Sequence, residues 1–493
     1  MILKGESNIS LVTRKNLVLF ICYPILSIMT VSLCFFTVLD KAVGQLTQVK
    51  LWISILLTCL LVFVGIRLLA NNCKSAPRSF LIIGIPALIM FSWFILPDQV
   101  PDEIWHIYRA INITWTGEPT LQVPDILTYR MVPQTYADYY NVLMTKDAWS
   151  SFHYVDRTLS AYYPHLYLFS GVLAELGKLI KLNPLIAVWM GRLGNSCFYL
   201  FCGYQMLKTI PIGKTISFVY LLNPMILELE ASCSADAVLI SVSVVFIAVF
   251  ISALVSEEHT RRDCLILVIL FVLVALSKQA YILMGCYFLS FCLVGKRGSR
   301  GRLVIGLSGA IALLGLVALL IIYPVGVDSE IGYAIDLMRQ PAEFISVMMK
   351  TIWEQLPFWV SSFAGGSLGA FSVATWQPAF WCYLILLALS VVVNEGDSKQ
   401  LAIGQRHFIW VASIVLVLIL VLPFRAWSVK VDGRSDIIQG VQGRYYFPFM
   451  LLPLICALNQ RNEIVKQGCY FKYGMVIVSI LFLDCISILI TFL

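Results

Sequence analysis

A short polar segment follows the third long apolar run of this sequence and carries two acids and a histidine. It reads Pro-Asp-Glu-Ile-Trp-His over residues 101–106. If a helix begins at Asp102, His106 lies one turn later on the same face, and Arg109 follows three positions further on. Carboxylates and imidazoles transfer protons, and charged groups at the edge of a membrane rarely persist without a function. Asp102, Glu103 and His106 are therefore our candidate catalytic residues.

Three further polar features lie at the ends of apolar runs. Asp236 ends a Ser-Cys-Ser-Ala-Asp segment, Lys278 joins two short apolar runs, and Arg444 lies in a Gln-Gly-Val-Gln-Gly-Arg-Tyr-Tyr segment. Two cations near a cluster of carboxylates suit a substrate that carries a phosphate on a lipid, with a carboxylate as proton acceptor. The residues that we predict to bind such a substrate are Arg109, Asp236, Lys278, Gln442, Arg444 and Tyr445.

Each of these features also has an explanation that involves no substrate. Asp236 can cap a helix N-terminus, Lys278 can extend its amine to the membrane surface, and Arg444 can anchor a helix there. Asp102 and Glu103 can simply begin a surface helix, whose dipole favours acids in its first turn. The convergence of all these features on one membrane face argues against four separate explanations of this kind.

A metal site is a separate possibility. Asp102, Glu103 and His106 offer oxygen and nitrogen ligands that suit Mg²⁺ or Mn²⁺, but a complete site needs further ligands from elsewhere. We favour hydrogen-bonded acids over a metal site at this segment, and we predict no certain cofactor.

The composition indicates the class of protein. Of 493 residues, 59% are hydrophobic and only 13% are charged, and the mean hydropathy is +0.85. Charged residues normally make up about a quarter of a soluble domain. The chain is therefore predicted to be an integral membrane protein with apolar runs of about 20 residues, each long enough to span the hydrocarbon core. The net charge of +7 is expected from cytoplasmic loops and does not indicate nucleic-acid binding.

The distribution of lysine and arginine places the N-terminus in the cytoplasm and predicts an all-α fold of about 13 spans, within a range of about 11–14. Residues 1–78 are expected to form N-terminal transmembrane helices, 79–459 a catalytic membrane domain, and 460–493 a C-terminal transmembrane helix. The expected spans are residues 17–39, 51–70, 79–97, 185–207, 212–228, 234–256, 263–277, 279–295, 303–323, 376–394, 407–424, 445–459 and 473–493.

The first large external loop is expected to cover residues 101–180. Its first part, 101–163, contains seven acidic, four basic and twelve aromatic residues. A disordered tether would be poor in aromatics, so we expect a structured loop at the interface, where Trp and Tyr are enriched. The remainder, 163–180, is only moderately apolar. We interpret it as a helix on the outer surface, because a span there would place Lys208 and Lys214 outside.

At these motifs the chain resembles a family of bacterial polytopic membrane proteins of unknown function. The hallmarks of that family are a P-D-E-x-x-H segment in an early external loop and a late Q-G-R-Y-x-x-P segment, present here at 101–106 and 442–448. The resemblance extends to Ser-Ala-Asp at 234–236 and Ser-Lys-Gln at 277–279, and it spans roughly residues 80–460.

That family in turn resembles the GT-C class of glycosyltransferases, which use polyprenyl-phosphate sugars. In such enzymes the first large external loop carries an acidic catalytic residue and helices on the membrane surface. The next span commonly begins with an Arg-Leu pair, matched here by Arg192-Leu193. GT-C enzymes usually have one span before that loop, whereas we expect three, so the first two are expected to be an N-terminal addition.

The resemblance implies an inverting mechanism. Asp102 would deprotonate an acceptor hydroxyl, which attacks the anomeric carbon, while Glu103 and His106 position Asp102, hold the acceptor or bind a cation. Arg444 and Lys278 would stabilise the charge on the departing polyprenyl phosphate, because a phosphate leaving group needs electrostatic stabilisation more than a proton. Asp236, for its part, would bind sugar hydroxyls or orient the lysine.

The chain is thus predicted to be a glycosyltransferase of the bacterial cytoplasmic membrane that acts on the extracytoplasmic face. Its partners would be a polyprenyl-phosphate-linked sugar donor, a glycan or lipid-linked acceptor, and membrane lipids. A transporter or flippase of a lipid-linked saccharide would also explain the many spans, but not the acid–imidazole cluster, and transporters tend to show internal repeats. A polysaccharide polymerase or ligase, with a lipid-linked oligosaccharide as donor, stays open. The sequence does not identify the sugar or the acceptor.

Overall fold

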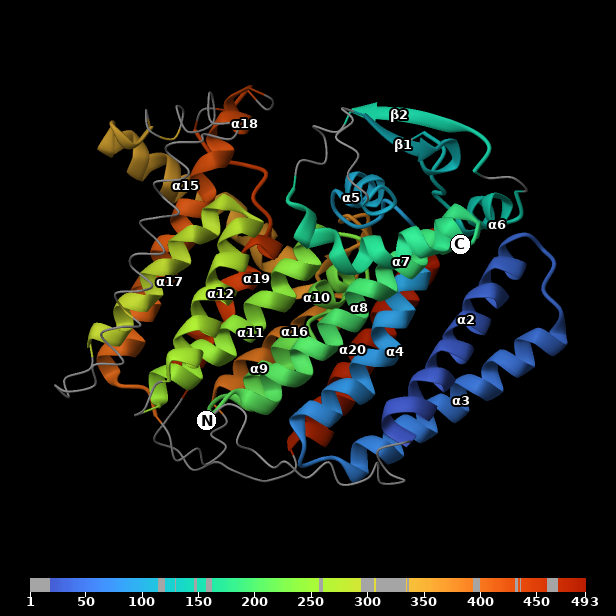
Figure 1. Ribbon diagram of the computed structural model, residues 1–493, viewed down its shortest axis with the longest axis horizontal. Coiled ribbons are helices and arrows are strands. Elements are labelled where there is room, and N and C mark those ends of the chain that lie inside the picture. The colour runs from blue at the N-terminus through green and yellow to red at the C-terminus, as the bar shows by residue number, and fades with distance from the viewer. Residues whose placement is uncertain are drawn as a thin grey trace.

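The computed structural model shows a bundle of long helices with smaller helices and two short strand pairs gathered at one end (Figure 1). The all-α expectation therefore holds for the body of the molecule but not for these two strand pairs. The described residues are 18–113, 120–128, 130–145, 149–156, 162–256, 260–293, 306, 334, 337–392, 400–430, 433–434, 436–458 and 469–493.

Seven helices among the described residues are long and apolar enough to cross a membrane. Each contains an 18-residue window with at most two charged side chains, which fits the roughly 30 Å of a bilayer core. They are α2 (Tyr23–Ala42), α3 (Gln48–Asn71), α4 (Ala76–Phe94), α8 (Pro184–Thr209), α11 (Ala235–Val255), α17 (Ile403–Val421) and α20 (Cys469–Phe492). A short π-helix, η1 (Val18–Cys22), precedes α2. Helix α17 continues through η6 (Leu422–Phe424) into α18 (Arg425–Lys430).

The expectation of about 13 spans is wrong for the described residues, because several apolar runs do not form one long helix. The run 212–228 is two helices, since Asn223 caps the second one and Pro224 cannot continue the first. Of the other expected spans, 303–323 lies outside the described residues except for position 306. The shorter apolar elements are α9 (Lys214–Leu221), α10 (Pro224–Glu230), α12 (Arg261–Ser277), η5 (Gln279–Leu293), α16 (Gln377–Val392), η7 (Gly443–Tyr446) and α19 (Phe447–Cys456).

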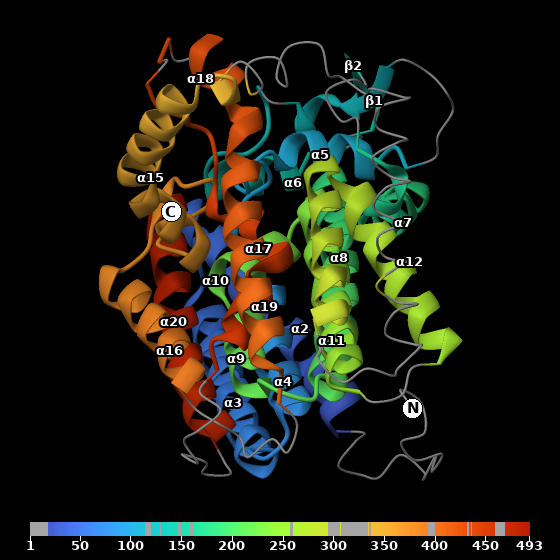
Figure 2. The same ribbon diagram turned by 90° about the vertical axis from the view of Figure 1, so that its left-hand side faces the viewer.

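The segment after α4 is structured, as expected, and lies at one end of the bundle (Figures 1 and 2). Its strands pair antiparallel, with Thr120 opposite Asp156. The segment 163–180 does not form a span: α7 has only 12 residues and packs along α8 at the same end as α5. The elements here are α5 (Glu103–Ala110), β1 (Thr120–Pro124), η2 (Asp125–Leu127), α6 (Tyr136–Leu143), β2 (Phe152–Asp156), η4 (Pro164–Tyr167) and α7 (Leu168–Leu179).

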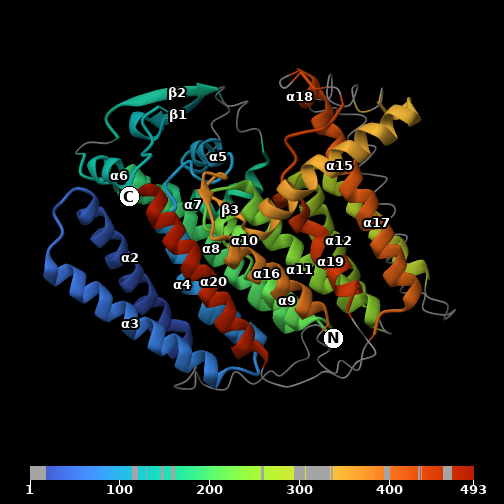
Figure 3. The same ribbon diagram turned by 180° about the vertical axis from the view of Figure 1, so that it is seen from behind.

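A second group of elements covers the same end from the other side (Figures 2 and 3). The long helix α15 (Pro341–Ala364) is followed by a tight hairpin of β3 (Ser367–Leu368) and β4 (Val373–Ala374). The C-terminal half of α15 packs on η7, where the Ser362 hydroxyl accepts a hydrogen bond from the Gly443 N–H at 2.8 Å. This contact fixes the backbone that carries the late Gln-Gly-Arg-Tyr motif.

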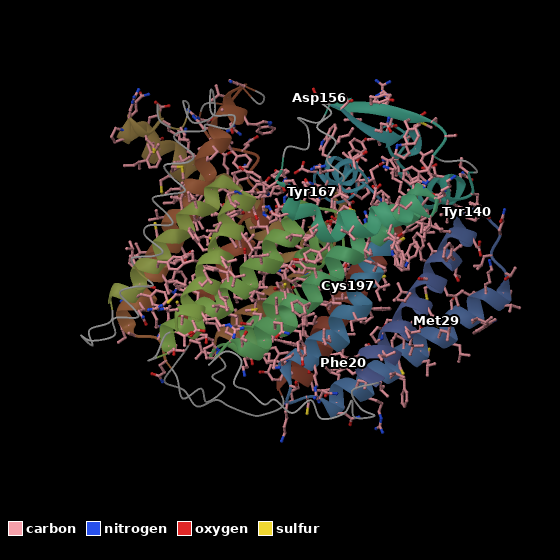
Figure 4. The ribbon with its side chains drawn as sticks, viewed as in Figure 1. Phe20, Met29, Tyr140, Asp156, Tyr167 and Cys197 are labelled. Carbon is pink, nitrogen blue, oxygen red and sulfur yellow. The ribbon has the colours of Figure 1, made fainter. Side chains whose placement is uncertain are left out.

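Aromatic packing joins the N-terminal helices to the rest of the bundle. Phe35 of α2 is fully buried and its ring contacts Trp93 and Phe94 of α4 and Tyr136 and Tyr139 of α6. Buried rings of this size contribute strongly to helix packing. In Figure 4, labelled residues mark the two ends: Asp156, Tyr140 and Tyr167 lie toward the end that carries α5, and Phe20 lies toward the other.

Candidate functional site

Asp102 begins α5, but its carboxylate does not cap that helix. Its backbone is left-handed, with a φ of 63°, and within the described chain its side chain makes no capping hydrogen bond. The Asp102 side chain is 63% exposed and is therefore available to other groups. A non-glycine residue in this conformation is uncommon and is often found at functional sites.

The carboxylate of Asp102 pairs with Arg444, which lies 342 residues later in the chain. Arg444 Nη2 donates to Asp102 Oδ2 at 2.5 Å, and Nη1 donates to the Pro101 carbonyl at 2.9 Å. The Arg444 side chain is only 2% exposed. The guanidinium is thus fixed by the turn that precedes α5.

Asp236 joins Arg444 to Lys278. Its two oxygens face different cations, with Lys278 Nζ 2.5 Å from Oδ1 and Arg444 Nη1 3.6 Å from Oδ2. Asp236 does not cap α11, since Ser234 is the N-cap residue and its hydroxyl accepts the Asp236 N–H at 3.1 Å. Lys278 follows α12 directly and folds inward to Asp236, with 21% of its side chain exposed.

Together these residues form a chain of alternating charge, which we call the charge chain: Asp102, Arg444, Asp236 and Lys278. The four sequence features that carry them are far apart in the chain and meet at one end of the bundle. Two carboxylates balance two cations, so the charge chain carries no net charge. Burial of ions is tolerated when each has a partner of opposite sign.

Two tyrosines lie against the cations. The Tyr445 ring centroid is 4.9 Å from Lys278 Nζ and 5.2 Å from Arg444 Cζ, and the Tyr162 ring centroid is 5.8 Å from the same ammonium. Cations are attracted to aromatic faces at such distances. Tyr445 was a predicted site residue. Tyr162 was not singled out as one, because nothing in its local sequence distinguishes it from the other aromatics of the loop.

His106 lies beside the charge chain and is nearly inaccessible, at 5% exposure. Its Nδ1 is 2.8 Å from the Tyr167 hydroxyl, and its ring lies 5.4 Å from that of Tyr162. Burial lowers the pKa of His106 to about 4, and the nearby Lys278 and Arg444 act in the same direction. The imidazole is therefore neutral near pH 7, which suits hydrogen bonding better than proton donation.

Glu103 points away from the charge chain and is completely buried. Both of its oxygens are held by the guanidinium of Arg192, at 2.9 and 2.6 Å. The sequence grouped Glu103 with Asp102 as a candidate catalytic acid, but the structure places the two adjacent carboxylates in different environments. One is exposed and the other is enclosed in an ion pair.

The remaining predicted site residues lie near these groups. Arg109 Nη1 donates to the Asn112 carbonyl at 2.8 Å, and its Cζ lies 5.9 Å from the centroid of the Tyr167 ring. The side-chain carbonyl oxygen of Gln442 is buried and has no hydrogen-bond partner among the described residues. Neither residue pairs with the charge chain in any described contact, so both are secondary candidates.

The three residues considered as metal ligands do not converge. Glu103 uses both oxygens on Arg192, and His106 Nδ1 faces Tyr167. In the described part of the chain, no group of three His, Cys, Asp or Glu side chains is placed to hold a metal ion. The donor set of Asp102, Glu103 and His106 therefore does not fit Mg²⁺ or Mn²⁺ in this arrangement.

A strained hairpin approaches the turn that holds Asp102. At its tip, Gly369, Ala370 and Phe371 all have positive φ values, and the Gly369 N–H donates to the buried Glu228 carboxylate at 2.8 Å. The next residue, Ser372, donates from its hydroxyl to Gln99 Oε1 at 3.2 Å. Left-handed backbone at non-glycine residues costs free energy and requires such support. In the sequence, the sign of an interrupted helix in this region is the pair Gly365-Gly366.

The comparison with protein families gives one match. The model of a family described as "Predicted membrane protein (DUF2142)" matches residues 86–453. This range contains all four members of the charge chain and excludes α2, α3 and α20. No curated protein and no solved structure matches the chain.

Proposed function

This multi-pass membrane protein belongs to the predicted membrane protein family DUF2142, and we propose that it is a glycosyltransferase of the GT-C type. It would transfer a sugar from a polyprenyl-phosphate donor to a cell-envelope glycan or lipid-linked acceptor, with inversion, on the extracytoplasmic face of the bacterial cytoplasmic membrane. The observation that carries the proposal is the charge chain. It combines one exposed carboxylate with two cations at the end of a membrane bundle.

Lys278 and Arg444 have the right chemistry for the donor. A sugar phosphodiester carries one negative charge, and the departing phosphate monoester gains another as the sugar–oxygen bond breaks. Fixed cations stabilise this new charge in the transition state more than in the bound donor, which is the requirement for catalysis. The guanidinium fork of Arg444 also matches the oxygens of a phosphate.

Asp102 has the right exposure for the base. The acceptor oxygen bonds to the anomeric carbon, its proton moves to the Asp102 carboxylate, and the electron pair of the broken bond leaves with polyprenyl phosphate. The Asp102 carboxylate accepts a hydrogen bond from Arg444. A donor phosphate that takes over these hydrogen bonds would release the carboxylate toward the acceptor, so donor binding should precede acceptor activation.

Tyr162 and His106 suit the sugar. A tyrosine ring can stack on a pyranose, and a neutral imidazole can donate or accept a hydrogen bond with a hydroxyl. Tyr162 is 39% exposed and its ring lies beside both His106 and Lys278. A sugar linked to a phosphate at Lys278 would therefore lie within reach of these two side chains.

The test uses the purified chain in proteoliposomes with polyprenyl-phosphate hexoses, and it measures release of free polyprenyl phosphate together with glycosylated acceptor. Asp102→Asn should lower turnover about 10²- to 10⁴-fold, as expected for loss of a general base. The same variant should bind polyprenyl phosphate at least as tightly as the wild type, because Arg444 loses a competing carboxylate. Asp125→Asn, in the same loop, is the matched control.

Three results would reject parts of the proposal. Full turnover in Asp102→Asn removes Asp102 as the base. Movement of a lipid-linked saccharide across the bilayer without any transfer indicates the transporter or flippase instead. Transfer of a whole lipid-linked oligosaccharide in preference to a single sugar indicates a polymerase or ligase.

A further inference from the structure

We infer that Arg192 and Glu103 are positioning residues, which fix the position of Asp102 relative to Asp236. This inference rests on the proposed function for its kinetic consequences. The structural link itself can be tested without any assumption about the reaction. The pair lies outside the charge chain, and its contacts reach the two segments that carry Asp102 and Asp236.

The ion pair is rigid and closed to water. Arg192 Nε donates to Glu103 Oε1 at 2.9 Å and Nη2 donates to Oε2 at 2.6 Å, a bidentate arrangement. The two side chains are 2% and 0% exposed. A bidentate guanidinium–carboxylate pair fixes orientation as well as distance, so the two backbones cannot rotate independently.

Arg192 also fixes the end of α4. Its Nη1 donates to the carbonyls of Ser92 and Ile95 at 2.9 and 2.5 Å, and its Nη2 donates to that of Leu96 at 3.1 Å. The Ser92 carbonyl belongs to the last turn of α4, where carbonyls lack partners within the helix, and Ile95 and Leu96 are the two residues that follow this helix. The turn that leads to Asp102 therefore starts from a point fixed by Arg192 and ends at Glu103, which Arg192 also holds.

Glu103 also connects the ion pair to the segment that carries Asp236. Its Oε1 also accepts the Cys233 N–H at 3.0 Å, three residues before Asp236. One turn after Arg192 on α8, Asn195 donates to the Ser232 carbonyl at 2.8 Å. The segment that begins α11 is thus tied both to Glu103 and to α8.

The acids and the cations of the charge chain are therefore held by different parts of the structure. Asp102 and Asp236 are carried by segments that the pair holds, whereas Arg444 and Lys278 are carried by η7 and the end of α12. Loss of the pair should therefore shift the acids relative to the cations. A displacement of about 1 Å at a catalytic group can lower turnover about 10²-fold. Binding of the donor phosphate through the cations should change much less.

The experiment compares single and double neutral variants. Glu103→Gln alone leaves Arg192 buried without a counter-charge and is expected to reduce the yield of folded protein. The double variant Glu103→Gln with Arg192→Gln removes both charges and should fold. We expect its kcat to fall about 10²-fold, with a donor KM within about threefold of the wild type.

Amide hydrogen exchange supplies a readout that does not depend on the reaction. In the double variant, exchange should rise in residues 97–106 and also in 231–236, because the hydrogen bonds of the pair reach both segments. The matched control is the ion pair of Lys50 and Asp40, 2.5 Å apart on the N-terminal helices. Lys50→Gln with Asp40→Asn should change neither segment and should leave kcat unaltered.

Wild-type kcat in the folded double variant would overturn the inference, as would a raised donor KM at constant kcat. If the wild type itself transfers no sugar, the proposed function fails. The exchange result then decides the inference alone. Unchanged exchange in 231–236 would show that the pair does not position that segment.

Discussion

Asp102 and Glu103 show how strongly the environment separates two identical functional groups. They are consecutive in sequence, yet one carboxylate is 63% exposed and the other is fully enclosed. The left-handed backbone at Asp102 turns its side chain away from the helix start, while Glu103 enters the bundle. The Asp102 carboxylate is accessible to other molecules, whereas the Glu103 carboxylate is enclosed by Arg192.

The burial of His106 makes the stability of the protein depend on pH. Its pKa is lowered to about 4 in the folded state, whereas an exposed histidine in the unfolded chain has a pKa of about 6.5. Between these values the unfolded state binds a proton that the folded state does not. The contribution to stability is therefore present above about pH 6.5 and is lost as the pH falls toward 4, by up to about 3 kcal/mol.

Thermal unfolding in detergent at pH 5 and pH 7.5 measures this effect. His106→Gln should show a smaller decrease in midpoint between the two pH values than the wild type. His153→Gln, at an exposed position on β2, should behave as the wild type does. An equal decrease in all three proteins would contradict the burial of a neutral imidazole at position 106.

All four members of the charge chain were candidate site residues from the sequence, and their roles stay predictions. Asp236, Lys278 and Arg444 could be identified because charged residues at the ends of apolar runs are costly. The pairing of Glu103 with Arg192 could not be foreseen, because it joins residues 89 positions apart on α5 and α8. No local pattern distinguishes an acid in an ion pair from an acid that faces a substrate.

At the scale of elements, Arg444 depends on a close approach of η7 to α15. A Cβ atom at Gly443 would lie 2.2 Å from the Trp359 carbonyl oxygen and 2.4 Å from the Phe363 nitrogen. Both are backbone atoms, which cannot move away by a change of side-chain rotamer. The position next to Arg444 therefore accepts only glycine if the two elements keep their distance.

Gly443→Ala should consequently displace η7 and the guanidinium beside it. We expect a loss of about 1–3 kcal/mol or more in stability, typical of overpacking, and a larger loss in polyprenyl-phosphate binding than in folding yield. Thermal unfolding and binding to vesicles that contain polyprenyl phosphate measure the two effects.

Gly84→Ala in α4 is the control for this substitution. Its nearest new contact is a Leu200 methyl group at 3.1 Å, which can move. That variant should fold and bind as the wild type does. If Gly443→Ala also binds normally, the contact between η7 and α15 does not hold Arg444.

Hydropathy alone predicted too many membrane helices for a physical reason. An apolar run such as 445–459 is hydrophobic enough to suggest a span, but its helix α19 has only ten residues and contains Pro453 in its interior. A count of apolar side chains measures burial in either lipid or protein. It cannot show which of the two surrounds a short, broken helix.

The whole molecule has two distinct ends. The strands β1 and β2, helices α5 to α7 and helix α18 gather at one end, and α2 and α4 extend between that end and the other (Figures 1 and 2). From the positive-inside rule we expect the strand end to lie outside and the opposite end to lie in the cytoplasm.

Cysteine labelling in intact cells tests this orientation. In a background without accessible native cysteines, Tyr154→Cys on β2, at a position 61% exposed, should react with a membrane-impermeant maleimide. Lys74→Cys, between α3 and α4, should react only after the membrane is opened. The reverse pattern would place the charge chain in the cytoplasm and remove the proposed reaction from the extracytoplasmic face.

The long sequence separations within the site have a consequence for how the protein is made. Translation proceeds at about 5–20 residues per second, so Glu103 leaves the ribosome several seconds before Arg192. Cys233 follows 130 residues after Glu103, and Arg444 comes 342 residues after Asp102. During insertion, Asp102 and Glu103 are therefore at the membrane edge before Arg444 and Arg192 have been made. Arg444 is made only after most helices have been inserted. A nascent chain therefore cannot complete the charge chain before Arg444 has been made.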